Sequence, residues 1–405
     1  MLHHVDSEVG KLHKVLLHRP GLEMNRLTPS NKDDLLFDDV LWLEKAQEEH
    51  KGFVKTLEDR GIEVVLLDNL LTETVEIPEA RQHLTDQLFT EEIYGTLAEP
   101  LRELVDDLTA REFATLMIAG MTKRELVEKL GDSSSVYLKT LELDDMILSP
   151  LPNHLFTRDT SCWVYDGVAV NSMQKPARRR ETINLAAIYR WHPSFANDDF
   201  NLWTDGQGGP ECAVEGGDVL IIGRGVVLVG MSERTTPIGV ERLAKRLFAN
   251  GSAKQIIALD MPKGRACMHL DTVMTMANEN TFSKYAGLGM LPSYSIFPGD
   301  NGGLDIVPNP AEEMHNVIAK ALGEPEIHIL TAPQDMLAAE REQWNDGCNM
   351  LTIAPGVVVT YERNVTTNAY FRQNGLEVLE VPGDELGRGR GGPRCMSCPM
   401  IRDGI

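Results

Sequence analysis

The chain of 405 residues is long enough for two or three ordinary domains, or for one large fold that carries an insertion. Hydrophobic residues make up 42% of it and charged residues 25%, which is typical of a soluble globular protein. The formal net charge of −22 argues against nucleic acid and anionic membranes as partners, because both are polyanions.

The N-terminal part of the sequence has the pattern of a strand–helix–strand unit. The apolar run at 14–18 predicts a short strand, and apolar residues at helical spacing predict a helix from about 39 to 60. Gly61 stands where the C-terminus of a helix favours a residue with positive φ, and IEVVLL at 62–67 predicts a buried strand. We therefore expect a β/α module here.

After this module the composition changes, because strand-like runs disappear and Leu, Glu, Ala and Asp dominate. Two capping boxes mark the starts of helices, Thr109 with Glu112 and Thr122 with Glu125. These features predict a compact all-helical insertion domain at 69–147.

Strand-like runs return after residue 148, with helical stretches between them. They favour repeated small β/α modules over one doubly wound sheet, and no G-x-G-x-x-G motif follows a strand. The predicted fold is thus α/β, with a main domain formed by 1–68 and 148–405. Strands are expected at 162–170, 218–230 (a hairpin with its turn at Gly223 or Gly225), 254–260, 354–361 and 376–382, and a helix at 237–251.

The cysteines are scattered, and only Cys395 and Cys398 lie close together in sequence. Nothing resembles a disulfide framework, and the N-terminal residues lack the apolar core and the small-residue cleavage site of a secretory signal. The sequence has no run of about eighteen or more apolar residues, which argues against a membrane span. We therefore expect a cytoplasmic protein.

Two polar clusters interrupt the apolar pattern next to predicted strands. The first, LPNHLFTRD at 151–159, is compatible with ordinary loop chemistry in which Asp159 caps a neighbouring element. The second, ECAVEGGDVL at 211–220, places Glu215 and Asp218 on either side of two glycines. These carboxylates suit cation binding or acid–base chemistry, but a turn with solvated acids would have the same pattern.

A third cluster, CMHLDTVMTM at 267–276, holds a histidine and a carboxylate among apolar residues, where charge is costly. If the segment is extended, His269 and Asp271 point to the same face, because side chains in a strand alternate with a period of two. A histidine beside a carboxylate can serve as a general acid or base, although such pairs are also structural. The apolar surroundings favour a functional role.

The fourth cluster, RCMSCP at 394–399, has two cysteines in C-x-x-C spacing. A zinc site needs about four ligands, and no second ligand pair completes one. A redox dithiol normally opens a helix, and no helix-forming segment follows here. A single nucleophilic cysteine, with a histidine and carboxylates supplied from elsewhere, fits better, but zinc and redox chemistry stay open at this point.

Together the four clusters resemble the arginine deiminase family. The residues that carry the resemblance are FTRD at 156–159, EGGD at 215–218, MHLDT at 268–272 and RCMSCP at 394–399. Their order and wide spacing are similar too, as is the helical segment after the first β/α module. The likeness extends over essentially the full chain, and separated motifs in the right order make a specific signal.

The resemblance implies a fold and a reaction that composition and spacing do not reveal. The fold would be a five-bladed pseudo-symmetric α/β propeller of the guanidine-modifying (pentein) superfamily, with a helical domain inserted after the first module. The reaction would convert free L-arginine and water to L-citrulline and ammonia, with neither a metal nor an organic cofactor. We expect a homo-oligomer that takes this small molecule as its substrate.

The resemblance also assigns roles to individual residues. Cys395 matches the nucleophile of the family. His269 and Glu215 match the proton-transfer pair, and Asp159 and Asp271 match the carboxylates that grip the guanidinium. The residues expected to line the pocket or to recognise the substrate are Asn153, Phe156, Arg178, Arg234, Arg390 and Asp218.

Other hypotheses stay open beside this one. Relatives that act on agmatine, methylated arginine or peptidyl arginine are the nearest, and the arginines matched to carboxylate recognition favour free L-arginine. A metal- or redox-linked binding protein that uses the C-x-x-C pair comes from another class, but it leaves His269 and Glu215 unexplained. Cys398 lies where family members vary, so we expect Cys395 to act without it.

Overall fold

The computed structural model describes residues 2–131 and 135–405, which adopt an α/β fold. The strands in these residues form separate sheets, and five of the sheets share one arrangement. Two strands run antiparallel, and after a helical connection the next strand pairs in parallel with the second of them. The repeated β/α modules expected from the sequence are therefore present.

Each of the five modules consists of an antiparallel strand pair, a helix and a third strand. The first has β20 (Cys398–Arg402), β2 (Leu12–Leu17), α2 (Leu43–Glu58) and β3 (Glu63–Leu66), and the second has β6 (Ser161–Val164), β7 (Gly167–Val170), α11 (Pro176–Trp191) and β8 (Asn201–Asp205). The third has β9 (Val219–Gly223), β10 (Val226–Met231), α13 (Pro237–Ala249) and β11 (Gln255–Asp260), extended by β14 (Ser293–Pro298) and β15 (Leu304–Asn309). The fourth has β12 (Met274–Asn278), β13 (Thr281–Lys284), α14 (Met314–Leu322) and β16 (His328–Leu330), and the fifth has β17 (Leu351–Ala354), β18 (Val357–Tyr361), α16 (Val365–Gln373) and β19 (Glu377–Val381).

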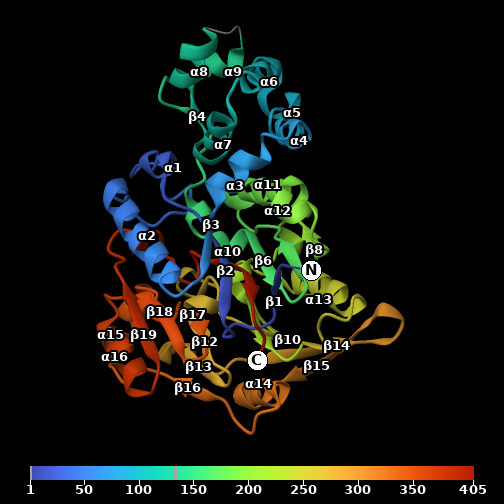
Figure 1. Ribbon diagram of the computed structural model, residues 1–405, viewed down its shortest axis with the longest axis vertical. Helices are drawn as coiled ribbons and strands as arrows, with labels where there is room; N and C mark the ends of the chain where they lie inside the picture. The colour runs from blue at the N-terminus through green and yellow to red at the C-terminus, as the bar shows by residue number, and fades with distance from the viewer. Residues whose placement is uncertain (1, 132–134) are drawn as a thin grey trace.

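The first module is built from both ends of the chain. β20 lies between β1 (His4–Val5) and β2, parallel to β1 and antiparallel to β2. Figure 1 shows the blue and red strands side by side there. A bridge between Val5 and Tyr165 links this sheet to the second module. The other strand pairings of the described residues stay within their own sheets, so no closed sheet forms.

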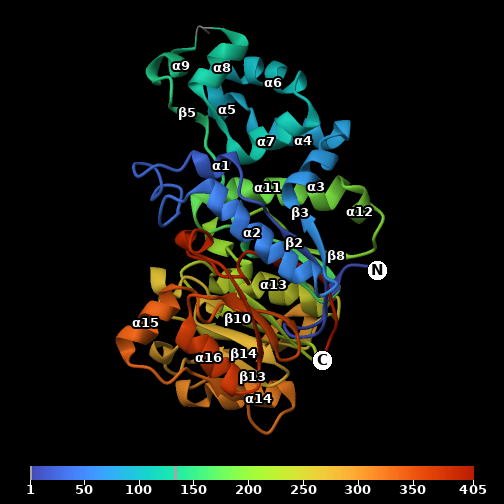
Figure 2. The same cartoon turned by 60° about the vertical axis from the view of Figure 1, so that its left-hand side comes forward.

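Most of the helices between the first and second modules gather at one end of the molecule, away from the sheets, whereas the first of them lies beside α11 (Figures 1 and 2). Both predicted capping boxes are formed, at Thr109 and at Thr122. The segment is not wholly helical, because β4 (Met121–Thr122) and β5 (Met146–Leu148) form a short antiparallel pair. The helices are α3 (Leu67–Thr74), α4 (Pro78–Leu88), α5 (Glu91–Tyr94), α6 (Ala98–Asp106), α7 (Ala110–Ala119), α8 (Lys123–Leu130) and α9 (Val136–Thr140).

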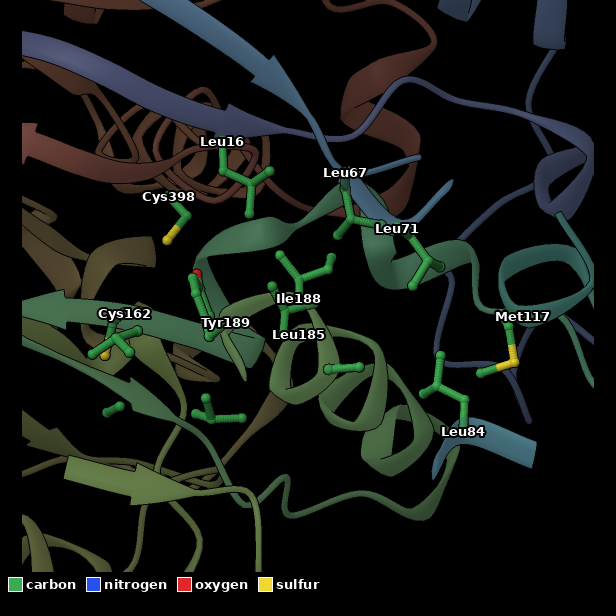
Figure 3. Close-up of a cluster of buried hydrophobic side chains, with 14 of the residues drawn as sticks. Leu16, Leu67, Leu71, Leu84, Met117, Cys162, Leu185, Ile188, Tyr189 and Cys398 are labelled. Carbon is green, nitrogen blue, oxygen red and sulfur yellow. The ribbon is translucent and has the colours of Figure 1, made fainter. Parts of the chain in front are cut away.

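A continuous apolar core joins the helical segment to the sheets. Figure 3 shows Leu67 and Leu71 of α3 facing Leu185 and Ile188 of α11. Residues three or four apart lie on the same face of a helix, so each pair presents one apolar stripe to the other helix. Cys398 is buried in the same core. Full burial stabilises each leucine or isoleucine side chain by roughly 1.5–3 kcal/mol, so this contact anchors the helical segment to α11.

Some elements differ from their sequence-based predictions. The strand expected at 162–170 is the β6–β7 hairpin, whose turn contains Tyr165 at φ 52°. The segment 218–230 forms the predicted hairpin, with Arg224 and Gly225 left-handed in the turn, as tight hairpins favour. β12 to β15 were missed, because polar residues and prolines dilute their apolar alternation. None of the helices described combines the length and apolar character needed to cross a membrane.

Candidate active site

The four polar motifs meet because each of them precedes the first strand of a module. α10 (Thr157–Thr160) leads into β6, η4 (Gly216–Asp218) leads into β9, and η6 (Leu270–Thr272) precedes β12. The fourth motif, at 394–397, leads into β20. Equivalent positions of the repeated modules therefore supply one site, although they are far apart in sequence.

The two glycines of the EGGD motif are required by the space around them. A Cβ atom on Gly217 would lie 2.7 Å from the ring of His269, and one on Gly216 would lie 2.0 Å from the carbonyl oxygen of Arg158. A larger residue at either position would displace a neighbouring motif. These glycines let three of the motifs approach one another closely.

Cys395 lies among these motifs with 3% of its surface exposed. Its Sγ lies 3.6 Å from Oδ2 of Asp271 and accepts a hydrogen bond of 3.1 Å from Nδ2 of Asn349. Burial, and then the negative charges of Asp271 and Asp159, raise the pKa of the Cys395 thiol well above its ordinary value. In this state the sulfur carries its proton, and Asn349 is placed to stabilise a thiolate when it forms.

Asn349 is a residue of the site that sequence reasoning missed. Its side chain is fully buried, and its Oδ1 accepts a hydrogen bond of 3.0 Å from the backbone amide of Cys395. One side chain thus fixes both the backbone and the sulfur of the cysteine. Asn349 precedes β17, the position in the fifth module equivalent to those of the four motifs. The module repeat was the signal that could have found it.

His269 and Glu215 form a buried ion pair, with 2.8 Å between Nε2 and Oε2. Burial opposes the charge of His269, but nearby carboxylates, first among them Asp159, outweigh it and raise the pKa of His269 to about 9. Burial also opposes the charge of Glu215, but Arg234 and His269 outweigh it and lower the pKa of Glu215 to about 2. His269 is therefore an imidazolium and Glu215 a carboxylate at neutral pH.

The local geometry of His269 and Asp271 differs from the expectation. An extended segment would place both side chains on one face, but η6 is a 3-10 turn that His269 precedes. His269 turns toward Glu215, whereas Asp271 turns toward Arg394, with 2.7 Å between Oδ2 and Nη1. The expected extended geometry was wrong, because a helical turn sends the two side chains to different partners.

Asp159 is held by Arg178, whose Nη1 lies 2.5 Å from Oδ2 of the carboxylate. The same guanidinium contacts Glu181 through Nε and Nη2 at 2.9–3.2 Å. Arg179 and Arg180, next in sequence, donate to backbone carbonyl groups instead and do not border the pocket. Of the three adjacent arginines, the structure brings Arg178 to the site, as expected.

The residues of the site enclose a small closed pocket. A volume of about 20 Å³ in it is accessible to water, which is room for about one water molecule. Glu215 and Asp271 lie behind its wall. The predicted residues that border the pocket are Asn153, Phe156, Asp159, Arg178, Arg234, His269, Arg390 and Cys395.

Asp218 is also buried behind the pocket and does not border it. Its Oδ1 accepts a hydrogen bond of 2.8 Å from the amide of Leu270, and its Oδ2 accepts one of 2.6 Å from the hydroxyl of Ser232. Burial raises the pKa of Asp218 to about 7. Both oxygens are thus engaged within the protein, and the carboxylate ties η4 to η6.

Arg390 closes the pocket from the loop that precedes the cysteine. Its backbone is left-handed at φ 65°, and its guanidinium carbon lies 3.5 Å from the centroid of the Trp344 ring. The side chain is buried, and its nitrogens have no hydrogen-bond partner among the residues that the structure describes. A Cβ atom on Gly391 would lie 2.3 Å from the ring of Phe156, so this glycine lets the loop lie against the pocket.

Cys398 has surroundings that differ from those of Cys395. It is fully buried in the core, where its thiol donates to the carbonyl oxygen of Ser161 at 3.3 Å. Neither cysteine of the C-x-x-C pair is in a disulfide. The structure therefore gives the two sulfurs different environments, one among polar groups and one among apolar side chains.

Asp159, Glu215 and His269 place possible ligand atoms within 4.8 Å of one another, a grouping that can hold a metal ion. In this structure His269 bonds to Glu215, while Arg178 and Arg234 lie against the two carboxylates. A metal ion would have to displace these ion pairs. Charge pairing therefore accounts for the grouping as it stands.

Comparisons with known proteins show what this chain is similar to. A family model described as arginine deiminase matches residues 33–402. SxtG, an amidinotransferase from Microseira wollei in saxitoxin biosynthesis, aligns over 100% of this chain and 98% of its own, with a TM-score of 0.58 and 13% identity. The N-terminal domain of ArgZ, an arginine dihydrolase from Cyanobacteria, aligns over 96% and 98% (TM-score 0.55, 14% identity). A dimethylarginine dimethylaminohydrolase aligns over 96% and 100% (TM-score 0.52, 14% identity).

Replacing Asn349 with Ala is expected to slow alkylation of Cys395. A hydrogen bond to a charged group contributes about 1.5–3 kcal/mol, so the thiolate fraction and the rate with iodoacetamide should fall about 10- to 100-fold. Mass spectrometry of the peptide that contains Cys395 measures this rate. The exposed Asn374→Ala is the control and should react like the wild type. Equal rates for Asn349→Ala and the wild type would contradict this role of Asn349.

The ion pair of His269 predicts an imidazole titration, followed by NMR, with its midpoint near pH 9. Because this pKa lies above the ordinary 6.5, His269 stabilises the fold fully below pH 6.5 and loses that contribution as the pH rises through about 9. Glu215→Gln should lower the midpoint, since it removes a carboxylate that favours the cation. An unchanged midpoint in this variant would show that Glu215 does not set the charge.

Proposed function

Because this chain belongs to the arginine deiminase family, we propose that it hydrolyses free L-arginine to L-citrulline and ammonia. It is an enzyme of the pentein superfamily, whose members modify amidino groups. The observation that carries the proposal is the closed pocket at which a cysteine, a histidine–glutamate pair and two aspartates converge.

The two aspartates suit a guanidinium ligand. A guanidinium carbon is a poor electrophile, because its charge is spread over three nitrogens, and carboxylates that hold its N–H groups present one face to a nucleophile. Asp271 lies behind the pocket wall beside Cys395, and once the loop of Arg390 moves it can offer Oδ1, which has no hydrogen-bond partner among the described residues. Asp159 can offer the second carboxylate, which it shares with Arg178. The bound cation offsets the cost of burying both.

The proposed reaction proceeds through a covalent intermediate. When the guanidinium is bound, the thiol of Cys395 loses its proton to water, and the thiolate attacks the guanidinium carbon and forms a C–S bond. His269 protonates the leaving nitrogen, the C–N bond breaks, and ammonia departs. A water molecule then adds to the amidino-enzyme while His269 takes its proton. The C–S bond then breaks as the adduct collapses to the carbonyl group of citrulline, and the hydroxyl proton of the adduct returns to the sulfur. Glu215 keeps the imidazole oriented through both steps.

The proposal also covers the recognition of the substrate carboxylate. Arg178, Arg234 and Arg390 border the pocket and supply positive charge for it, and Asn153 and Phe156 complete the wall. The closed pocket has no room for arginine, so the loop of Arg390 must move to admit it. Arg390, which lacks a hydrogen-bond partner among the described residues, then pairs with the carboxylate.

The proposal also covers the architecture, the domains, the location, the oligomeric state and the cofactor requirement. Five modules that contribute equivalent residues support a five-bladed pseudo-symmetric α/β propeller. The catalytic domain comprises 1–68 and 148–405, and 69–147 forms the helical insertion domain. The enzyme acts in the cytoplasm as a homo-oligomer, and needs neither a metal nor an organic cofactor, because Cys395 supplies the nucleophile and His269 supplies the proton.

An unreactive cationic ligand should accelerate alkylation of Cys395. Burial and the acidic neighbours keep the thiol protonated in the free enzyme, so a guanidinium bound between the acids should lower the pKa of the thiol. The measurement is the alkylation rate across a pH series with a guanidinium ligand that leaves Sγ exposed, and a neutral ligand of similar shape is the control. An alkylation rate that the cation leaves unchanged would contradict the hypothesis that the substrate helps to ionise the thiol.

A citrulline assay with L-arginine, agmatine, methylarginine and an arginine peptide tests the substrate. We expect kcat/KM for L-arginine to exceed the others by at least about 100-fold, since an analogue without a free carboxylate leaves buried arginines unpaired. Cys395→Ala should abolish turnover. Cys398→Ala should keep kcat and lose roughly 1 kcal/mol of stability, as expected for one small buried group.

Three outcomes of this assay would contradict the proposal. Equal turnover of agmatine would refute the assignment to free L-arginine. A folded Cys398→Ala as inactive as Cys395→Ala would refute the assignment of the nucleophile. Activity lost on chelation and restored by one divalent metal would point instead to a metal held by Asp159, Glu215 and His269.

A further inference from the structure

Arg394 makes an extended set of contacts immediately before the nucleophile. Its Nη1 donates to Oδ2 of Asp271 at 2.7 Å, and its Nε and Nη2 donate to the two carboxylate oxygens of Glu8 at 3.1 Å each. Nη2 also donates to the carbonyl oxygen of Val219 at 2.9 Å. All three charged side chains are buried. One guanidinium therefore bridges two carboxylates, one of which belongs to the site.

We propose that Glu8 and Arg394 are positioning residues that fix the orientation of Asp271 and preserve its negative charge for a cationic substrate. This inference rests on the proposed function, because it concerns the carboxylate assigned to the guanidinium.

The orientation of Asp271 follows from the contacts of its two oxygens. Arg394 engages Oδ2, whereas Oδ1 has no hydrogen-bond partner among the described residues. Rotating the carboxylate of Asp271 would break its hydrogen bond to Arg394. The two hydrogen bonds from Arg394 to Glu8 hold the guanidinium in place, so it cannot rotate with the carboxylate. Asp271, whose Oδ2 lies 3.6 Å from Sγ of Cys395, thus keeps its other oxygen without a protein partner among the described residues.

The charge of the site depends on Glu8. Alone, Arg394 would neutralise Asp271 and weaken its attraction for a second cation. Glu8 engages the other side of the same guanidinium, so the group of three side chains keeps a net negative charge. Burial opposes the charge of Glu8, but Arg394 and Arg158 outweigh it and lower the pKa of Glu8 to about 2. Glu8 is therefore ionised at any pH at which the enzyme would work.

Glu8 is itself held firmly. Its Oε1 also accepts a hydrogen bond from the backbone amide of Ile221, and its backbone oxygen accepts a hydrogen bond from Arg402. Two further guanidinium groups, those of Arg158 and Arg402, act electrostatically on Glu8. Removing its charge would leave Asp271 alone against the guanidinium groups of Arg158, Arg394 and Arg402, and the larger positive charge behind the pocket would repel a cationic ligand.

A buried ion pair can also be merely structural, and a binding experiment separates the two roles. The Cys395→Ala background prevents turnover, and calorimetry compares L-arginine with the neutral L-citrulline. Glu8→Gln keeps the shape of the side chain and removes its charge. We expect it to raise the Kd of L-arginine about tenfold and that of L-citrulline by less than about twofold. Glu23→Gln, at another buried glutamate in an ion pair, should change neither.

An unchanged Kd for L-arginine, or equal losses for both ligands, would overturn the inference, because only a charge effect selects for the cation. If Glu8→Gln does not fold by circular dichroism, Arg394→Lys carries the test. Lysine keeps the charge but cannot bridge both carboxylates, so the same cation-selective loss is expected. If Cys395→Ala with Glu8 intact binds no L-arginine, the proposed function fails, and the role of Glu8 fails with it.

Discussion

Removing a carboxylate from water costs several kcal/mol unless an opposite charge lies close to it, and this pocket is surrounded by buried carboxylates. The buried cations follow from that cost: Arg178 lies against Asp159, Arg234 and His269 lie against Glu215, and Arg394 lies against Asp271. The balance is incomplete, since Oδ1 of Asp271 lacks a hydrogen-bond partner among the described residues, as does the guanidinium of Arg390. These two groups have charges opposite to those at the two ends of the proposed substrate, zwitterionic arginine.

The module repeat explains why so few segments build the site. Each motif lies at the same place in its module, before the first strand, and short helical turns there direct polar side chains away from the sheets. The apolar strands supply a rigid frame, while the glycines of the motifs allow close approach. Variation in these short turns can therefore change the chemistry without disturbing the frame.

The features that depend on local sequence were predictable, and those that depend on distant contacts were not. The capping boxes at Thr109 and Thr122 and the hairpin at Gly225 follow from neighbouring residues alone. The course of the chain between His269 and Asp271 does not, because the two side chains pair with Glu215 and Arg394, which are far away in sequence. Asn349 carries no motif of its own, and its role became visible only from its place in the fifth module.

The position of β20 has a consequence for the biosynthesis of this protein. Glu8 and Arg394 are 386 residues apart, and β2 gains its partner β20 only after the residues between them have been synthesised. Until then β2 has an unpaired edge, and an exposed strand edge invites association with other chains. The strand that covers this edge directly follows the segment of Cys395. The growing chain therefore lacks Cys395, the proposed nucleophile, until the segment that covers the exposed edge of β2 has been synthesised.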